Sequence, residues 1–148
     1  MNLKEKINND LKDAMKAGDK LKLETVRSIR ALILEFEKSG AGKELTQDDE
    51  VKMLSTAVKK RKDSIEQFRN AGRGELAVKE EKELEILLTY LPKQLSEEEI
   101  YSEIKRLAAE IGATSKSDFP KLMPLVMKEL KGKADGKLVK SIVEKILL

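Results

Sequence analysis

The stretch LKGKADGKLV, residues 130–139, gathers lysines around two glycines and one aspartate, between two segments with helical periodicity. Gly132 suits the left-handed backbone that follows a helix, and Asp135 suits the N-cap of the next helix. Gly136 would then lie in the first helical turn and leave the backbone N–H groups uncovered. Such N–H groups, the positive end of the helix dipole and nearby ammonium groups attract phosphate. The candidate phosphate-binding residues are Gly136, Lys128, Lys131, Lys133, Lys137 and Lys140.

The same stretch also suits a plain helix–turn–helix corner. Asp135 would then occupy part of the N–H donors and bring a negative charge to them. A nucleotide-binding P-loop is excluded, because that motif needs four residues between its first glycine and its Gly-Lys pair, followed by Ser or Thr. Here three residues separate Gly132 from Gly136, and Leu138 follows the lysine. A phosphate site and a plain corner both remain as interpretations.

A second basic surface is predicted on a helix that Thr46 and Asp49 would cap and that would end at Gly72-Arg73-Gly74. One stripe of this helix, about a quarter turn wide, would carry Lys52, Lys59, Lys62, Arg69 and Arg73. Glu66 lies in the same stripe and dilutes its charge. A basic face is typical of a solvated helix, and it also suits a track of phosphate contacts whose affinity depends on salt.

The composition limits the chemistry that the chain can perform. Among its 148 residues there is no cysteine and no histidine, which excludes disulfides, zinc sites with Cys or His ligands and cysteine nucleophiles. We therefore expect no metal, no cofactor and no catalytic residue. Aromatic residues make up only 3%, which argues against stacking of single-stranded bases. The N-terminus has no signal-peptide pattern and no apolar run is long enough for a membrane span, so we expect a cytoplasmic protein without membrane contact.

Charge is unevenly distributed along the chain. Residues 52–73 hold seven Lys or Arg against two acids, residues 75–103 nine Glu against three Lys, and residues 112–148 eight Lys against four acids. Such segregation favours an anionic partner. The acidic group Glu80, Glu81, Glu83 and Glu85 is interpreted as a solvated surface, because its spacing scatters it around a helix.

Tyr90 and Tyr101 are interpreted as packing residues at a domain boundary.

The elements that must position these residues are all helices. Apolar residues recur at helical spacing in every segment, and no segment shows the alternation of a strand. The pattern predicts an all-α fold with a four-helix N-terminal domain, residues 1–91, and a three-helix C-terminal domain, residues 96–148. The first two helices would end at Gly18 and at Gly40-Ala41-Gly42, and the fourth would cover about residues 76–91.

The C-terminal helices are expected at about residues 97–111, 118–131 and 136–147. Ser96 and Glu99 form a capping-box pattern at the start of the first of these helices. Pro92 ends the preceding helix, because a residue before proline is disfavoured in helical geometry. Pro124 lies deep in the middle helix and lacks an N–H, so we expect it to kink or delay that helix.

The segment KGKADGKLVKSIVEKIL closely resembles the C-terminal signature of the YqeY-like family (GatB/YqeY). Three further segments resemble the family's opening helices, its central helices and its interdomain joint: LKDAMKAGDKLKLETVRSIRALI, KKRKDSIEQFRNAGRGELAVKEEKELEIL and YLPKQLSEEEI. The resemblance covers nearly the whole chain. One departure is FPKLMP, residues 119–124, where similar sequences usually show glycine and Val-Met-Gly.

The resemblance implies a helical two-domain fold and kinship with the tail domain of the B subunit of the glutamine-dependent aminoacyl-tRNA amidotransferase, a module that contacts tRNA. We therefore expect a non-catalytic accessory protein that binds tRNA or another structured RNA. Two alternatives stay open. One is a protein–protein adaptor, with a protein partner at the charged surfaces. The other is a component of a carbon–nitrogen ligase with glutamine as amido-N-donor.

Overall fold

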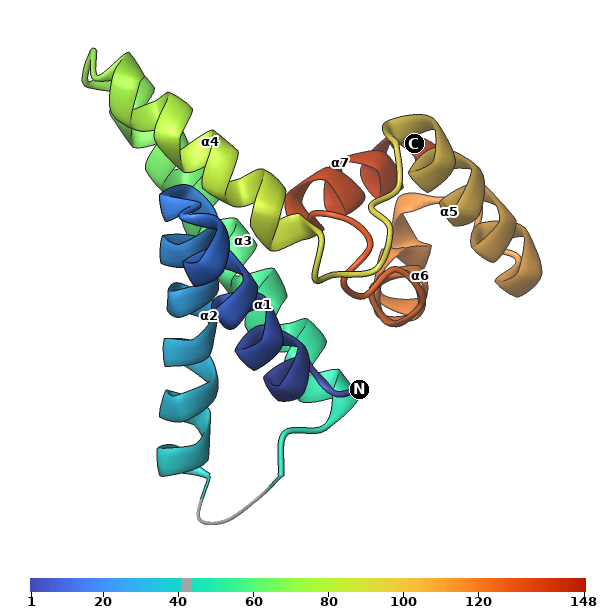
Figure 1. The fold of residues 1–148 in the computed structure, drawn as a ribbon. Helices are drawn as coiled ribbons and strands as arrows, with labels where there is room; N and C mark the ends of the chain where they lie inside the picture. Colours follow the sequence, from blue (N-terminus) through green and yellow to red (C-terminus); the bar gives the residue numbers. More distant parts are fainter. Residues whose placement is uncertain (41–43) are drawn as a thin grey trace. The chain divides into compact units, whose positions relative to one another are not determined.

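The structure, a computed structural model, describes residues 1–40 and 44–148 (Figure 1). Within these ranges the regular elements are α-helices and one short 3₁₀ helix, without a strand, which confirms the all-α prediction. Contacts divide the chain into two compact units, Met1–Leu91 and Pro92–Leu148. The expected domains, 1–91 and 96–148, stay a prediction, because a domain is defined by folding on its own. Each unit is described by itself.

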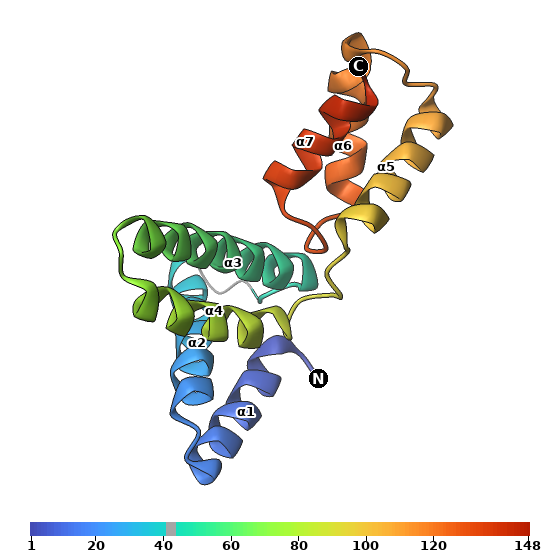
Figure 2. The same cartoon turned by 90° about the horizontal axis from the view of Figure 1, so that it is seen from above.

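The N-terminal unit consists of two helical hairpins. Helices α1 (Leu3–Ala17) and α2 (Lys20–Ser39) form the first hairpin, and α3 (Gln47–Asn70) and α4 (Gly74–Leu88) form the second. The two hairpins pack across each other (Figures 1 and 2). Their crossing buries an aliphatic core of Leu3, Ile7, Val26, Ile29, Ile33, Leu54, Val58 and Leu87.

The ends of these helices follow local sequence signals. The expected cap pair at Thr46 and Asp49 forms a full capping box. The first helix ends at Gly18, as predicted, and this glycine adopts the left-handed conformation with φ of 66°. The predicted end of the second helix is met at Gly40, which caps α2, whereas Ala41 and Gly42 lie outside the described residues.

A half-buried guanidinium joins three helices of this unit. The Nη1 atom of Arg61 on α3 donates to Glu83 Oε2 at 2.5 Å and to Glu80 Oε2 at 3.0 Å, both on α4. Its Nη2 atom donates to Ser28 Oγ on α2 at 3.1 Å. Glu83 is only 7% exposed. The interpretation of residues 80–85 as a solvated acidic surface is therefore wrong for Glu83 and Glu80.

The two tyrosines contact residues of their own units. Tyr90 donates its hydroxyl to Asp10 Oδ2 at 2.5 Å, and the ammonium of Lys6 lies 5.1 Å from the centre of its ring. Burial and the Asp10 carboxylate raise the pKa of the Tyr90 phenol well above its usual value. Tyr101 is 44% exposed, with Lys105 over its ring. Tyr90 thus connects the end of the N-terminal unit to α1 through its hydrogen bond with Asp10.

The C-terminal unit contains α5 (Glu97–Ile111), the 3₁₀ helix η1 (Lys116–Asp118), α6 (Phe119–Glu129) and α7 (Gly136–Ile146). Ser96 caps α5 in the predicted capping box, and its N–H and hydroxyl lower the pKa of Glu99. The three α-helices enclose a separate core of Ile100, Ile104, Leu107, Ala108, Leu122, Val126, Leu130, Val139, Ile142, Val143 and Leu147.

Helix α6 runs through Pro124 without interruption, so the expected delay of this helix is wrong. Pro120 lies in the first turn, where a missing N–H costs nothing. Pro124 withholds a hydrogen bond from the carbonyl of Pro120, four residues earlier. Both prolines are exposed, so water can bind that carbonyl. The buried side chains Leu122 and Val126 then stabilise the helix from the core side.

We expect Arg61→Met to lower the free energy of unfolding by about 3 kcal/mol, because it leaves the buried Glu83 carboxylate without its cation. The double variant Arg61→Met/Glu83→Leu should recover most of this loss. The control Lys62→Met changes an exposed residue of the same helix and should shift stability by less than about 0.5 kcal/mol. Urea unfolding followed by circular dichroism measures all three. Equal losses in Arg61→Met and Lys62→Met would contradict the assignment.

We also expect residues 92–148 to fold when expressed alone, because their core is separate from that of the N-terminal unit. The fragment should be helical and should unfold cooperatively on heating. A fragment that begins at residue 96 should be less stable, since it lacks the hydrogen bonds from Gln94 and Leu95 to the α6–α7 corner. A gradual, non-cooperative loss of helix in both fragments would refute the domain division.

Candidate nucleic-acid interface

The corner between α6 and α7 has a fixed conformation. Gly132 adopts φ of 73°, in the left-handed region that glycine occupies without strain. The N–H of Lys133 donates to Leu130 O at 2.9 Å and closes the turn. From the preceding segment, Gln94 Nε2 donates to Gly132 O at 2.7 Å and Leu95 N–H to Lys133 O at 2.8 Å. The corner is therefore anchored to the segment before α5.

The N-terminus of α7 keeps part of its hydrogen-bonding capacity. Asp135 is the N-cap, as predicted, and its Oδ1 accepts from the N–H of Lys137 at 3.2 Å. Within the described residues, the N–H groups of Gly136 and Leu138 have no acceptor. The carboxylate thus occupies one donor of the first turn and leaves two for a ligand or for water.

Gly136 is not required by the packing around it. A Cβ atom built on this residue would lie 3.8 Å from Met127 Cε, which is an ordinary van der Waals contact. Its φ is not positive, so an alanine would be unstrained. What the glycine provides is open access to the N–H groups beside it.

The predicted lysines all lie on the surface of this corner or of the adjoining helices. Lys128 is in the last turn of α6, Lys131 and Lys133 are in the connecting segment, and Lys137 and Lys140 are in α7. All five are exposed. The corner therefore combines a partly uncapped helix N-terminus with several ammonium groups, and both features attract anions such as phosphate.

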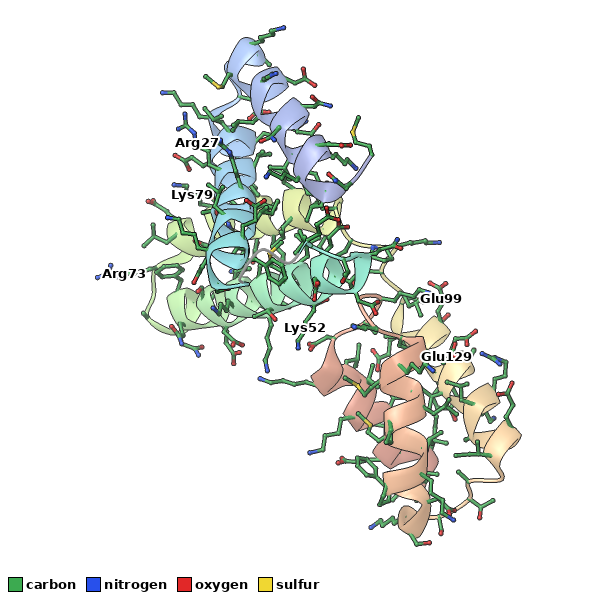
Figure 3. All side chains as sticks on the ribbon, turned by 90° about the horizontal axis from the view of Figure 1, so that it is seen from below. Arg27, Lys52, Arg73, Lys79, Glu99 and Glu129 are labelled. Atoms are coloured by element: carbon green, nitrogen blue, oxygen red, sulfur yellow. The ribbon has the colours of Figure 1, made fainter. Side chains whose placement is uncertain are left out.

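The predicted basic stripe is present on α3 in a reduced form. Lys52, Lys59 and Lys62 are exposed, and no ion pair to them occurs among the described residues; Lys52 projects away from the ribbon (Figure 3). Arg69 is different, because it forms an ion pair with Glu81 of α4. Arg73 lies outside α3, at the N-cap of α4. The stripe thus offers three lysines that form no ion pair within the described part of the chain.

Sequence reasoning missed the role of Arg61, although a signal was present. Arg61 follows Leu54 by seven residues and Val58 by three, so it lies on the buried stripe of α3. Glu83 precedes Leu87 by four residues on the buried side of α4. Charged residues on two facing apolar stripes indicate an internal ion pair.

The described residues contain neither a candidate metal site nor a candidate membrane-spanning helix. No group of three or more acidic side chains there could hold a metal ion. No helix in residues 1–40 and 44–148 has the length and hydropathy needed to cross a membrane.

The chain is similar in sequence to known proteins over most of its length. A family model described as "Yqey-like protein" matches residues 4–147. The chain is similar to "Altered inheritance of mitochondria protein 41, mitochondrial" of three fungi. It is 33% identical to that of Pyrenophora tritici-repentis over 93% of this chain and 77% of the relative. The relative from Lachancea thermotolerans is 34% identical over 75% of this chain and 60% of the relative. The relative from Clavispora lusitaniae is 36% identical over 70% of this chain and 61% of the relative. The chain thus spans less than two thirds of the length of the latter two.

We expect Asp135→Ala to destabilise the chain by about 1 kcal/mol, because the N-cap hydrogen bond to Lys137 is lost. The matched variant Asp135→Asn keeps a capping oxygen and should remain within a few tenths of a kcal/mol of the wild type. Urea unfolding of the full chain compares the two. If Asn were as destabilising as Ala, the charge of Asp135 and not its cap would stabilise the corner.

Proposed function

Because the chain belongs to the Yqey-like protein family, we propose that it binds tRNA or another structured RNA and performs no catalysis on its own. The observation that carries the proposal is the α6–α7 corner. There, two N–H groups that have no acceptor in residues 1–40 and 44–148 lie beside exposed lysines. The resemblance to an amidotransferase tail domain, a module that contacts tRNA, supports the same ligand.

The corner residues would bind the phosphate backbone in complementary ways. The N–H groups of Gly136 and Leu138 would donate directly to phosphate oxygens. Lys131, Lys133 and Lys137 would supply the charge, with Lys128 and Lys140 beside them. On the N-terminal unit, Lys52, Lys59 and Lys62 would contact further phosphates, whereas Arg69 would first have to leave Glu81. Such contacts recognise the shape and backbone of RNA rather than its sequence.

The alternatives have less support. An adaptor that docks through the acidic residues 80–85 is weakened, because Glu80, Glu81 and Glu83 are already paired with arginines of α3. Participation in a carbon–nitrogen ligase with glutamine as donor would require catalytic centres on other chains. The names of the fungal relatives describe them as mitochondrial, whereas for this chain we propose a cytoplasmic location.

Replacing Lys131, Lys133 and Lys137 by glutamate should abolish binding of total tRNA, because three phosphate contacts become repulsive. For the wild type, contact with about four phosphates predicts a log–log salt slope on the order of three. Electrophoretic mobility shifts from about 50 to 200 mM salt measure both quantities.

The matched control replaces three lysines of the same unit outside the corner, Lys105, Lys121 and Lys145, by glutamate. This control should retain much more tRNA affinity than the corner variant. Gly136→Ala adds a test of the backbone contact, since it should preserve stability and still weaken binding. Binding that ignores salt, or equal losses in both triple variants, would refute the proposal.

A further inference from the structure

A groove of about 520 Å³ opens between α2 and α3 in the N-terminal unit. Among the described residues these two helices make few contacts with each other, because both pack on α4. The fully buried side chains of Ile29 and Leu87 form the bottom of the groove. The groove therefore leads from the surface directly to the core of the unit.

The wall formed by α3 has two rows of side chains. The inner row is Met53, Ala57 and Arg61, and the outer row is Lys52, Thr56 and Lys60. Each row repeats at intervals of four residues, so the wall is about 12 Å long, or slightly more than two helical turns. Leu32 and Phe36 line the opposite wall on α2. The result is an apolar groove whose α3 edge is cationic.

The cationic side chains at this edge differ in whether they form ion pairs within the fold. The guanidinium of Arg61 is held by Glu83 and Glu80, so its charge is largely neutralised within the fold. Lys52 and Lys60 are exposed, and no ion pair to either occurs in residues 1–40 and 44–148. Among the described residues that line the groove, Asp49 alone is acidic, and it accepts from the N–H and hydroxyl of Thr46.

We propose that this groove docks an acidic amphipathic helix of a partner protein. An apolar groove about two turns long matches a helix that presents bulky side chains at positions i, i+4 and i+7. Carboxylates along one flank of that helix would face Lys52 and Lys60, whereas lysines there would be repelled. Met53 can adjust to side chains of different shape. An RNA backbone, by contrast, would leave the apolar walls uncovered.

The test uses a synthetic peptide of fourteen residues with leucines at i, i+4 and i+7 and glutamates on both flanks. Fluorescence anisotropy measures its binding to the full chain, and NMR locates it through the methyl groups of Met53 and Ile29. A matched peptide with lysine for every glutamate should bind at least about tenfold more weakly. Equal affinity of the two peptides, or no binding of the acidic peptide below about 1 mM, would overturn the proposal.

Two substitutions in the chain test separately how the shape of the groove and the charge of its edge contribute to peptide binding. Ala57→Leu fills the groove and should weaken peptide binding by about tenfold, and Lys60→Glu should do the same by repulsion. Neither residue belongs to the proposed RNA surface, and circular dichroism with urea unfolding reports whether both variants are folded. Lys82→Glu, an exposed change on α4 away from the groove, is the control and should bind the peptide as the wild type does. Wild-type affinity in Ala57→Leu would place the peptide elsewhere.

Discussion

The N-terminal unit depends on the guanidinium of Arg61, which lies half-buried among three helices. Its hydrogen bonds to Glu83, Glu80 and Ser28 connect α3 to both α4 and α2. A charge in this position must be paired, because an isolated ion away from water is costly. Together with the burial of Leu54 and Val58, these bonds determine which face of α3 is turned toward the core. Lys52, Lys59 and Lys62 consequently face solvent, and Met53 and Ala57 face the groove.

The pairing of charges within the fold also explains the charge of the rest of the surface. Glu80, Glu81 and Glu83 form ion pairs with arginines of α3, so these three glutamates add little net negative charge to the surface of α4. The lysines of α3 and of the α6–α7 corner remain exposed. A chain with a formal net charge of only +3 thus presents basic surfaces that its composition does not reveal.

The two proposed binding surfaces differ in physical character. The corner of the C-terminal unit offers backbone donors and ammonium groups, which suits a solvated phosphate. The groove of the N-terminal unit combines apolar walls with a cationic edge, which suits an amphipathic helix. Lys52 belongs to both the basic stripe and the groove edge. A protein with both surfaces could bring an RNA and a protein partner together.

The sequence by itself determined the helices, their caps and the corner. These features depend on neighbours three or four residues apart, as in the capping boxes at Thr46 and Ser96 and the N-cap at Asp135. Only the tertiary structure decided which charges are used internally. Arg61 and Glu83 lie 22 residues apart and meet only when α3 packs on α4. The uninterrupted helix at Pro124 is likewise a tertiary result, because the burial of Leu122 and Val126 outweighs one missing hydrogen bond. Sequence patterns three or four residues long reflect interactions within one helix or turn. Ion pairs between helices depend on how the helices pack, which no single segment of the sequence specifies.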